Sequence, residues 1–226
     1  MTGEEFERRG RLLEQDPDRD PDAARCRIEL LEGIVCMSPG PDLDYHGVPS
    51  STLSLIVGQY RIATPGVVSS GEAEIEIDPE TRLTPDHLLF ITPECGGQMR
   101  RDADGRTRGI PELCIEVANT SVLRDVTQKR DVYERAGVQE YLVYATRERQ
   151  MLLWHRGESG RFESVRLING QLASAVFPGL VFDVESIVHG EDADAVAALK
   201  TGPDDRAHRA FVEQLATAGE ADGKSN

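Results

Sequence analysis

The sequence contains no long apolar run and no cysteine motif. None of its hydrophobic stretches approaches the roughly 18 residues that a membrane-spanning helix requires. The four cysteines form no CxxC pair and have no histidine at the spacing of a zinc site. The first residues, MTGEEFERRGRLLEQD, lack the apolar centre of a secretory signal. We therefore expect a protein of the reducing cytoplasm with no membrane partner.

The sequence also has too few basic residues to bind nucleic acid by charge alone. Its formal net charge is −15, and residues 27–189 hold 24 acids and 16 bases, so the acidic excess is not confined to the ends. Proteins that coat nucleic acid need clustered Lys and Arg to neutralise phosphates. A nucleic-acid substrate would therefore have to be held by a local basic patch, a divalent cation or another subunit.

The chain length suits a single folded domain, since 226 residues are enough for one well-buried core. Residues 1–24 are polar and acidic, which predicts a flexible leader. Residues 25–189 contain the regular apolar patterns and are expected to form the domain. Helical patterns at about 191–200 and 205–218 predict a helical C-terminal extension over residues 190–226 that ends in a polar tail.

Apolar spacing predicts alternating strands and helices, and hence an α/β fold. The segment 93–109 is polar, rich in glycine and locally basic, which predicts a mobile loop carrying Arg100, Arg101, Arg106 and Arg108. The expected elements are a hairpin at 27–38, helices at 45–63 and 121–136, and strands at about 67–77, 84–91, 111–118, 139–145, 150–155 and 161–167.

Glu116 is the most informative candidate for chemistry. It stands inside Leu-Cys-Ile-Glu-Val-Ala, where an ionisable side chain must be paired, bound to a metal or directed into a cleft. The alternative is an exposed position on a sheet with one wet face. Asp86 begins another apolar strand, so the two carboxylates are candidates to share a hard cation through oxygen ligands.

Lys129 lies thirteen residues after Glu116 on the second predicted helix, which can pack back over the strand that precedes it. The spacing also has an ordinary interpretation. Asp125 and Lys129 stand four residues apart, as in a favourable exposed ion pair. From spacing alone the exposed pair is the preferred interpretation.

Taken together, the motifs of residues 27–187 resemble a restriction endonuclease family, the Uma family, once a domain of unknown function, within the PD-(D/E)XK nuclease superfamily. Each motif is weak alone, and their order and spacing carry the resemblance. The motifs are Glu29-Leu30-Leu31-Glu32-Gly33, Met37-Ser38-Pro39, His46, Pro85-Asp86, Pro111 to Val117, Asp125 with Lys129 and Tyr133, Ala136 to Tyr141, and Phe177-Pro178-Gly179-Leu180.

The resemblance implies a restriction-endonuclease-like mixed central sheet flanked by helices. It further implies that Asp86 and Glu116 bind Mg²⁺ or Mn²⁺ and that Lys129 completes the catalytic set. In the superfamily the lysine usually stands two residues after the glutamate. That position is Ala118 here, so the role passes to Lys129. Smaller departures from the family pattern are His87, Asn119 and Leu142.

Other residues are candidates for supporting roles. Glu29 resembles an early glutamate of the superfamily that contacts the metal through water, although an exposed strand position is an equal alternative. His46 is either close to the cleft or, at the start of a helix, a cap or packing residue. The arginines of the 100–108 segment are the expected phosphate contacts.

Three functions remain open from the sequence. The first is a metal-dependent endonuclease that hydrolyses phosphodiester bonds of nucleic acid, with DNA the expected substrate. The second is a catalytically silent relative that serves as a binding or regulatory module. The third is a dimerisation domain, and a homodimer is one assembly that the sequence allows.

Overall fold

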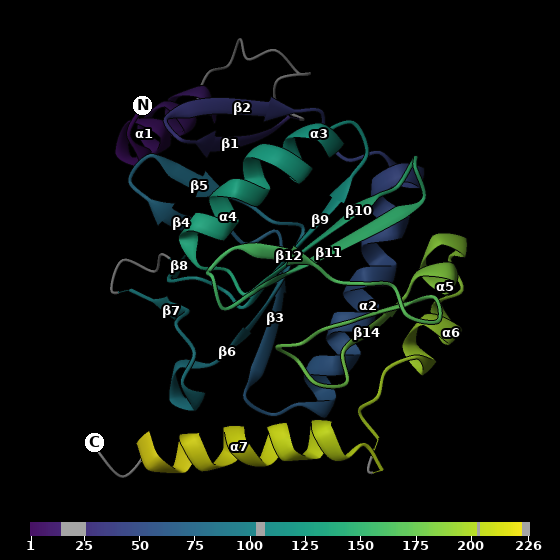
Figure 1. The fold of residues 1–226 in the computed structure, drawn as a ribbon. Helices are drawn as coiled ribbons and strands as arrows, with labels where there is room; N and C mark the ends of the chain where they lie inside the picture. Colours follow the sequence, from purple (N-terminus) through teal and green to yellow (C-terminus); the bar gives the residue numbers. More distant parts are fainter. Residues whose placement is uncertain (15–25, 103–106, 203, 223–226) are drawn as a thin grey trace.

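A mixed six-stranded sheet lies at the centre of the computed structural model, which describes residues 1–14, 26–102, 107–202 and 204–222 (Figure 1). Its strand order is β12-β11-β10-β9-β6-β3, and the one neighbouring pair of these strands that is parallel is β9 with β10. The predicted α/β class and mixed sheet are therefore confirmed. The strands are β3 (Val67–Gly71), β6 (His87–Ile91), β9 (Leu113–Ala118), β10 (Glu140–Ala145), β11 (Gln150–Arg156) and β12 (Phe162–Ser164).

A second six-stranded sheet contains the predicted N-terminal hairpin, in which Glu32 and Gly33 form the turn with φ of 51° and 78°. The predicted strand at 67–77 is two strands in different sheets, because the chain bends at Glu72, where φ is 51°. The order is β2-β1-β5-β4-β8-β7. The strands are β1 (Arg27–Leu31), β2 (Ile34–Ser38), β4 (Ile75–Asp78), β5 (Thr81–Leu83), β7 (Arg100–Arg101) and β8 (Thr107–Arg108).

The two predicted helices of the domain are present, and each includes a π-helical turn. The first consists of η2 (Leu43–Gly47) and α2 (Val48–Ala63). The second consists of α3 (Val122–Arg124), η4 (Asp125–Lys129) and α4 (Arg130–Ala136), and it ends at Gly137, whose φ is 99°. A glycine at this position satisfies the left-handed conformation that ends many helices.

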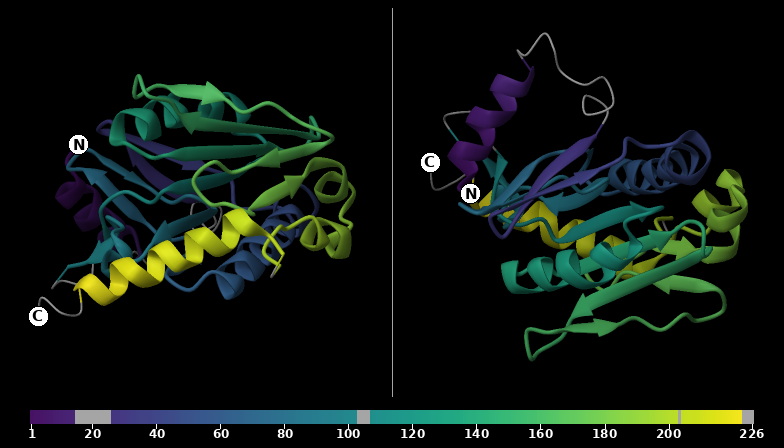
Figure 2. Two further views of the ribbon diagram at one scale, coloured as in Figure 1. Left: turned by 60° about the horizontal axis from the view of Figure 1, so that its bottom comes forward. Right: turned by 90° about the horizontal axis from the view of Figure 1, so that it is seen from above.

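The central sheet separates two apolar cores, and this separation determines where Glu116 points. Along β9, Leu113, Ile115 and Val117 belong to the core on the α2 side. Cys114 and Ala118 belong to the core on the α4 side. Because side chains alternate along a strand, Glu116 faces the α4 side, between the two sheets. The right view of Figure 2 shows the two sheets from above.

The C-terminal part covers the opposite face of the central sheet (Figures 1 and 2). The hairpin β13 (Gln171–Ala173) and β14 (Val181–Asp183) leads into α5 (Val184–His189), α6 (Asp192–Ala197) and α7 (Arg206–Asp222). Buried Leu215 on α7 joins the core on the α2 side. In α7, His208 Nε2 lies 2.9 Å from Thr64 Oγ1 at the end of α2. The helices predicted near 191–200 and 205–218 thus correspond to α6 and α7.

The structure differs from the sequence-based prediction in two polar segments. Within the predicted leader, residues 3–14 form the helix α1 (Gly3–Glu14), which is attached to the second sheet because Glu7 pairs with buried Arg82. Residues 15–24 lie outside the described residues. The predicted loop at 93–109 includes η3 (Pro93–Cys95) and the short strands β7 and β8. Among the described residues, no helix is both long and apolar enough to span a membrane.

Candidate active site

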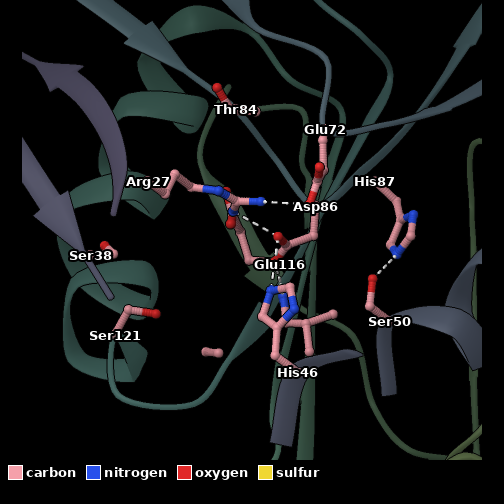
Figure 3. Close-up of polar contacts among 12 residues, drawn as sticks. Arg27, Ser38, His46, Ser50, Glu72, Thr84, Asp86, His87, Glu116 and Ser121 are labelled. Atoms are coloured by element: carbon pink, nitrogen blue, oxygen red, sulfur yellow. Dashed lines mark hydrogen bonds and ion pairs between the residues drawn. The ribbon is translucent and has the colours of Figure 1, made fainter. Parts of the chain in front are cut away.

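An open pocket of about 280 Å³ lies between the β1–β2 hairpin, the start of β6, the end of β9 and the helix 122–136. Five residues predicted from the sequence line it, namely Glu29, His46, Asp86, Glu116 and Lys129. Figure 3 shows Arg27, His46, Asp86 and Glu116 pointing toward one another. The structure therefore brings these five residues together from five separate segments of the chain.

Asp86 is the carboxylate at the entrance to β6. Its Oδ2 accepts a hydrogen bond of 2.6 Å from the Val117 backbone N–H, which fixes it against β9. Its Oδ1 lies 2.7 Å from Arg27 Nη1 and 3.1 Å from His46 Nε2. Burial acts to raise the pKa of Asp86, but the hydrogen bond with His46 and the charge of Arg27 outweigh burial and lower the pKa to about 2. Asp86 is therefore ionised at neutral pH.

Glu116 is the second carboxylate and is almost completely buried. Its Oε1 accepts hydrogen bonds of 2.9 Å from Lys129 Nζ and 3.1 Å from Tyr133 Oη. Burial raises the pKa of Glu116 well above its usual value, and the charge of Lys129 acts in the opposite direction. The exposed-strand alternative for Glu116 is wrong.

Lys129 links two carboxylates that stand on different strands, Glu29 on β1 and Glu116 on β9. Its Nζ lies 2.9 Å from both Glu29 Oε1 and Glu116 Oε1, and 3.9 Å from Asp125 Oδ1. Burial acts to lower the pKa of Lys129, but Glu116, Glu29 and Asp125 outweigh burial and raise it, so the side chain remains a cation. Asp125 and Lys129 are each about 2% exposed, so the interpretation of this pair as a surface ion pair is wrong.

The π-helical turn η4 determines the position of Lys129. Asp125 opens this turn and Lys129 closes it, and both side chains are buried. The Asp125 carbonyl accepts hydrogen bonds from the Arg130 N–H and from the Tyr141 hydroxyl, the latter at 3.1 Å. Tyr141 thus anchors the turn to β10. Single π turns are common at functional sites because they redirect side chains.

Two buried polar atoms at the pocket have no hydrogen-bond partner among the described residues. They are Asp125 Oδ1 and Arg124 Nε, which lie 4.0 Å apart. Asp125 Oδ2, by contrast, accepts a bond of 2.5 Å from Ser121 Oγ. Buried polar atoms normally have partners, so this part of the pocket suits a group that both donates and accepts, such as water.

The start of the first helix is attached to β6 by two adjacent contacts. His46 and Ser50 lie four residues apart and contact the consecutive residues Asp86 and His87 (Figure 3). Ser50 Oγ lies 2.9 Å from His87 Nε2, and burial lowers the pKa of His87. The predicted alternative for His46, a helix cap, is not its role here, since the side chain of Asp42 caps this helix.

The donor set of the pocket suits magnesium rather than zinc. Mg²⁺ is usually held by one or two carboxylates and keeps several waters. Asp86 and Glu116 provide hard oxygen ligands of this kind, and both described hydrogen bonds to Glu116 end on Oε1, which leaves Oε2 available. In the described part of the chain, no group of three or more His, Cys, Asp or Glu side chains is placed to hold a metal. Asp86 and Glu116 are the two carboxylates that would hold such a metal.

The predicted phosphate contacts lie elsewhere. Arg108 pairs with Glu76 at 2.9 Å and with Asp102 at 2.7 Å, and neither Arg100 nor Arg108 is among the residues that line the pocket. Arg106 and the side chain of Arg101 lie outside the described residues. The arginines that do line the pocket are Arg27, Arg124 and Arg147. They come from three separate segments of the chain, so no single cluster of arginines in the sequence identifies them.

Comparisons with known proteins identify the fold and the family of the chain. In the crystal structure of a protein from Anabaena variabilis ATCC 29413, described as a "putative nuclease belonging to DUF820", 98% of the chain aligns with 84% of this one. The TM-score is 0.60 and the identity 14%, which supports a shared fold. A search of curated proteins finds no match. The family model Uma2, described as "Putative restriction endonuclease", matches residues 11–185. The chain therefore belongs to the Uma2 family.

Proposed function

We propose that the protein is a magnesium-dependent endonuclease that hydrolyses phosphodiester bonds of DNA. Membership of the Uma2 family supports a nuclease role. One observation carries the proposal further. Asp86 and Glu116, from the adjacent strands β6 and β9, line the same pocket as the buried ammonium of Lys129. This combination of two carboxylates and a lysine suits phosphodiester hydrolysis through a metal-activated water.

The residues of the pocket can each be given a role in that reaction. Bound Mg²⁺ would lower the pKa of a water molecule and stabilise charge on the phosphate. Lys129 has three N–H donors, of which Glu29 and Glu116 accept two. The third is available to orient a water or to neutralise a phosphate oxygen. Glu29 also accepts a bond of 3.0 Å from the Thr84 N–H, so it holds Lys129 in a fixed position.

The charge balance of the pocket supports cation binding. Four carboxylates line it, those of Glu29, Asp86, Glu116 and Asp125, and the cations closest to them are Lys129 and Arg27. An added divalent cation reduces the repulsion between buried carboxylates.

A divalent-ion titration tests the proposal. The wild-type protein should bind Mg²⁺ or Mn²⁺ and cleave plasmid DNA when either ion is present, with no cleavage in EDTA. Asp86→Ala should lose binding and cleavage together. Asp131→Ala is the matched control. Asp131 lies on the same helix as Lys129, two residues further along, but its side chain is 61% exposed. Cleavage that persists in EDTA or in Asp86→Ala would overturn the proposal.

A specific observation favours the second function, a silent binding module. Asp86 is paired with Arg27 and Glu116 with Lys129, so each of the two carboxylates has a countercharge that the protein itself supplies. A silent module predicts that neither metal binding nor DNA cleavage is measurable in the wild-type protein. The titration above therefore separates the two functions.

A further inference from the structure

Three segments meet beside the catalytic pocket and form a rim. The rim consists of Tyr45, Asn119, Thr146 and Arg147. Thr146 Oγ1 donates to the Tyr45 carbonyl at 2.8 Å and to the Ala118 carbonyl at 3.2 Å. Arg147 Nε donates to Asn119 Oδ1 at 2.5 Å. Because these bonds link the start of the first helix, the end of β9 and the end of β10, the rim has a defined geometry.

Arg147 is held on this rim without an acidic partner. Its guanidinium carbon lies 4.3 Å from the centre of the Tyr45 ring, within the range of a cation–π contact. Across the described residues, no carboxylate forms an ion pair with Arg147. Its Nη1 and Nη2 donate no hydrogen bond to any described residue. A planar guanidinium whose Nη1 and Nη2 have no acceptor among the described residues is well suited to bind an anion.

The rim lies at the edge of the sheet where a substrate is expected. Asn119 follows β9 and Thr146 follows β10, the two parallel strands of the central sheet (Figure 1). Ligands commonly bind beyond the carboxyl ends of parallel strands. Asn119 and Arg147 line the same pocket as Asp86 and Glu116. The rim is therefore continuous with the candidate active site.

The pocket also extends beyond the catalytic residues. A second hollow of about 410 Å³ shares Ser38, Pro39, Thr120, Ser121 and Arg124 with it. The second hollow reaches Leu123, Thr127 and Gln128, which the catalytic pocket does not. Because the two hollows share these five lining residues, they form one groove that runs from the catalytic residues along the helix 122–136.

We propose that Arg147, stacked on Tyr45, binds a backbone phosphate of a nucleic-acid strand that lies in this groove. The proposal rests on the proposed function, since it names the substrate contact of the same pocket. Arg147 takes the role that sequence analysis gave to the arginines of the 100–108 segment. The contact is to phosphate and therefore positions the strand without reading its sequence.

Binding of labelled duplex DNA in EDTA at several salt concentrations tests this proposal without requiring cleavage. Arg147→Ala should weaken binding by about threefold to tenfold and make the slope of log K against log salt shallower by about 0.9, the value for one lost phosphate contact. Arg166→Ala removes the same charge from an exposed position outside the groove and should leave the slope unchanged. Equal slopes for the two variants, or no DNA binding by the wild-type protein, would overturn the proposal.

Two further measurements distinguish a bidentate contact from a simple charge effect, and a strand from a single nucleotide. Arg147→Lys keeps the charge but loses the planar fork, so it should keep the slope and still bind less tightly than the wild type. If Arg147→Ala weakens the binding of a mononucleotide but not of the duplex, the assignment of this contact to a strand is overturned. If the Arg147→Ala slope changes but no variant or wild type cleaves DNA with Mg²⁺, the proposed function fails and the phosphate contact stands.

Discussion

Lys129 Nζ lies 2.9 Å from Glu116 Oε1 inside the protein, where both side chains are almost completely buried. Removing the ammonium leaves Glu116 and Glu29 without their countercharge. We expect Lys129→Met to lower the free energy of unfolding at pH 7 by about 3–5 kcal/mol. Urea denaturation measures this loss. The double variant Lys129→Met/Glu116→Gln should recover part of it, and a single variant within about 1 kcal/mol of the wild type would contradict the expectation.

The pair formed by Arg27 and Asp86 predicts the behaviour of the proposed metal site. Arg27 Nη1 lies 2.7 Å from Oδ1 of Asp86, the carboxylate that is proposed to hold the metal. Arg27→Gln removes a competing positive charge, so Mg²⁺ should bind about fivefold more tightly, equivalent to about 1 kcal/mol. Isothermal titration calorimetry at pH 7 measures this change. Arg135→Gln, which alters an exposed pair with Glu32, is the control. Weaker binding in Arg27→Gln would show that Arg27 positions Asp86 for the metal.

Glu140 predicts a pH dependence of stability that is independent of the catalytic pocket. Burial raises the pKa of Glu140 from 4.5 to about 7. In the unfolded chain the carboxyl ionises near its ordinary value, so the folded state loses stability as the pH rises from about 4.5 to about 7. The slope is about 1.4 kcal/mol per pH unit, or roughly 3 kcal/mol in all. Below pH 4.5 Glu140 is protonated in both states and costs no stability, and above about pH 7 the cost no longer changes with pH.

The variant Glu140→Gln should remove this slope, because a neutral amide does not ionise. Its oxygen can still accept from the Ala175 N–H, and its amide can donate to Ser174 Oγ. Thermal unfolding between pH 4 and pH 8 compares the two proteins. Glu148→Gln, at an exposed position, should follow the wild-type curve. Parallel curves for wild type and Glu140→Gln would show that Glu140 does not titrate in this window.

Replacement by alanine should have opposite effects on stability at two glycines, Gly58 and Gly179. Gly58 lies inside α2, and a methyl group there would meet no atom within 4 Å. Gly58→Ala should stabilise the protein by about 0.5–1 kcal/mol, because alanine loses less conformational freedom in a helix. Gly179 has a φ of 89°, and a methyl group there would lie 2.3 Å from the Lys200 carbonyl oxygen. Gly179→Ala should therefore lower the melting temperature. A destabilised Gly58→Ala would contradict the argument.

Much of the fold and the central carboxylate could be predicted from the sequence. The apolar spacing of residues 121–136 predicted a helix, and the continuous apolar run at 111–118 predicted a buried strand. Glu116 was identifiable because it stands between Ile115 and Val117, in the middle of the buried part of that run. Asp86 was a candidate from its place at the start of an apolar strand, but the resemblance was needed to assign Asp86 and Lys129 to the site. A Pro-Asp pair and a lysine four residues after an acid are common on protein surfaces.

The sequence by itself determined the periodicity of each element, and with it the buried face on which Glu116 stands. Only the tertiary structure decided which side chains meet there. Arg27 and Arg147 reach the pocket from segments far apart in the chain, and the clustered arginine Arg108 pairs with Glu76 instead. The physical reason is that burial follows from local apolar spacing, whereas ion pairing depends on distances of a few ångströms between segments that only packing brings together.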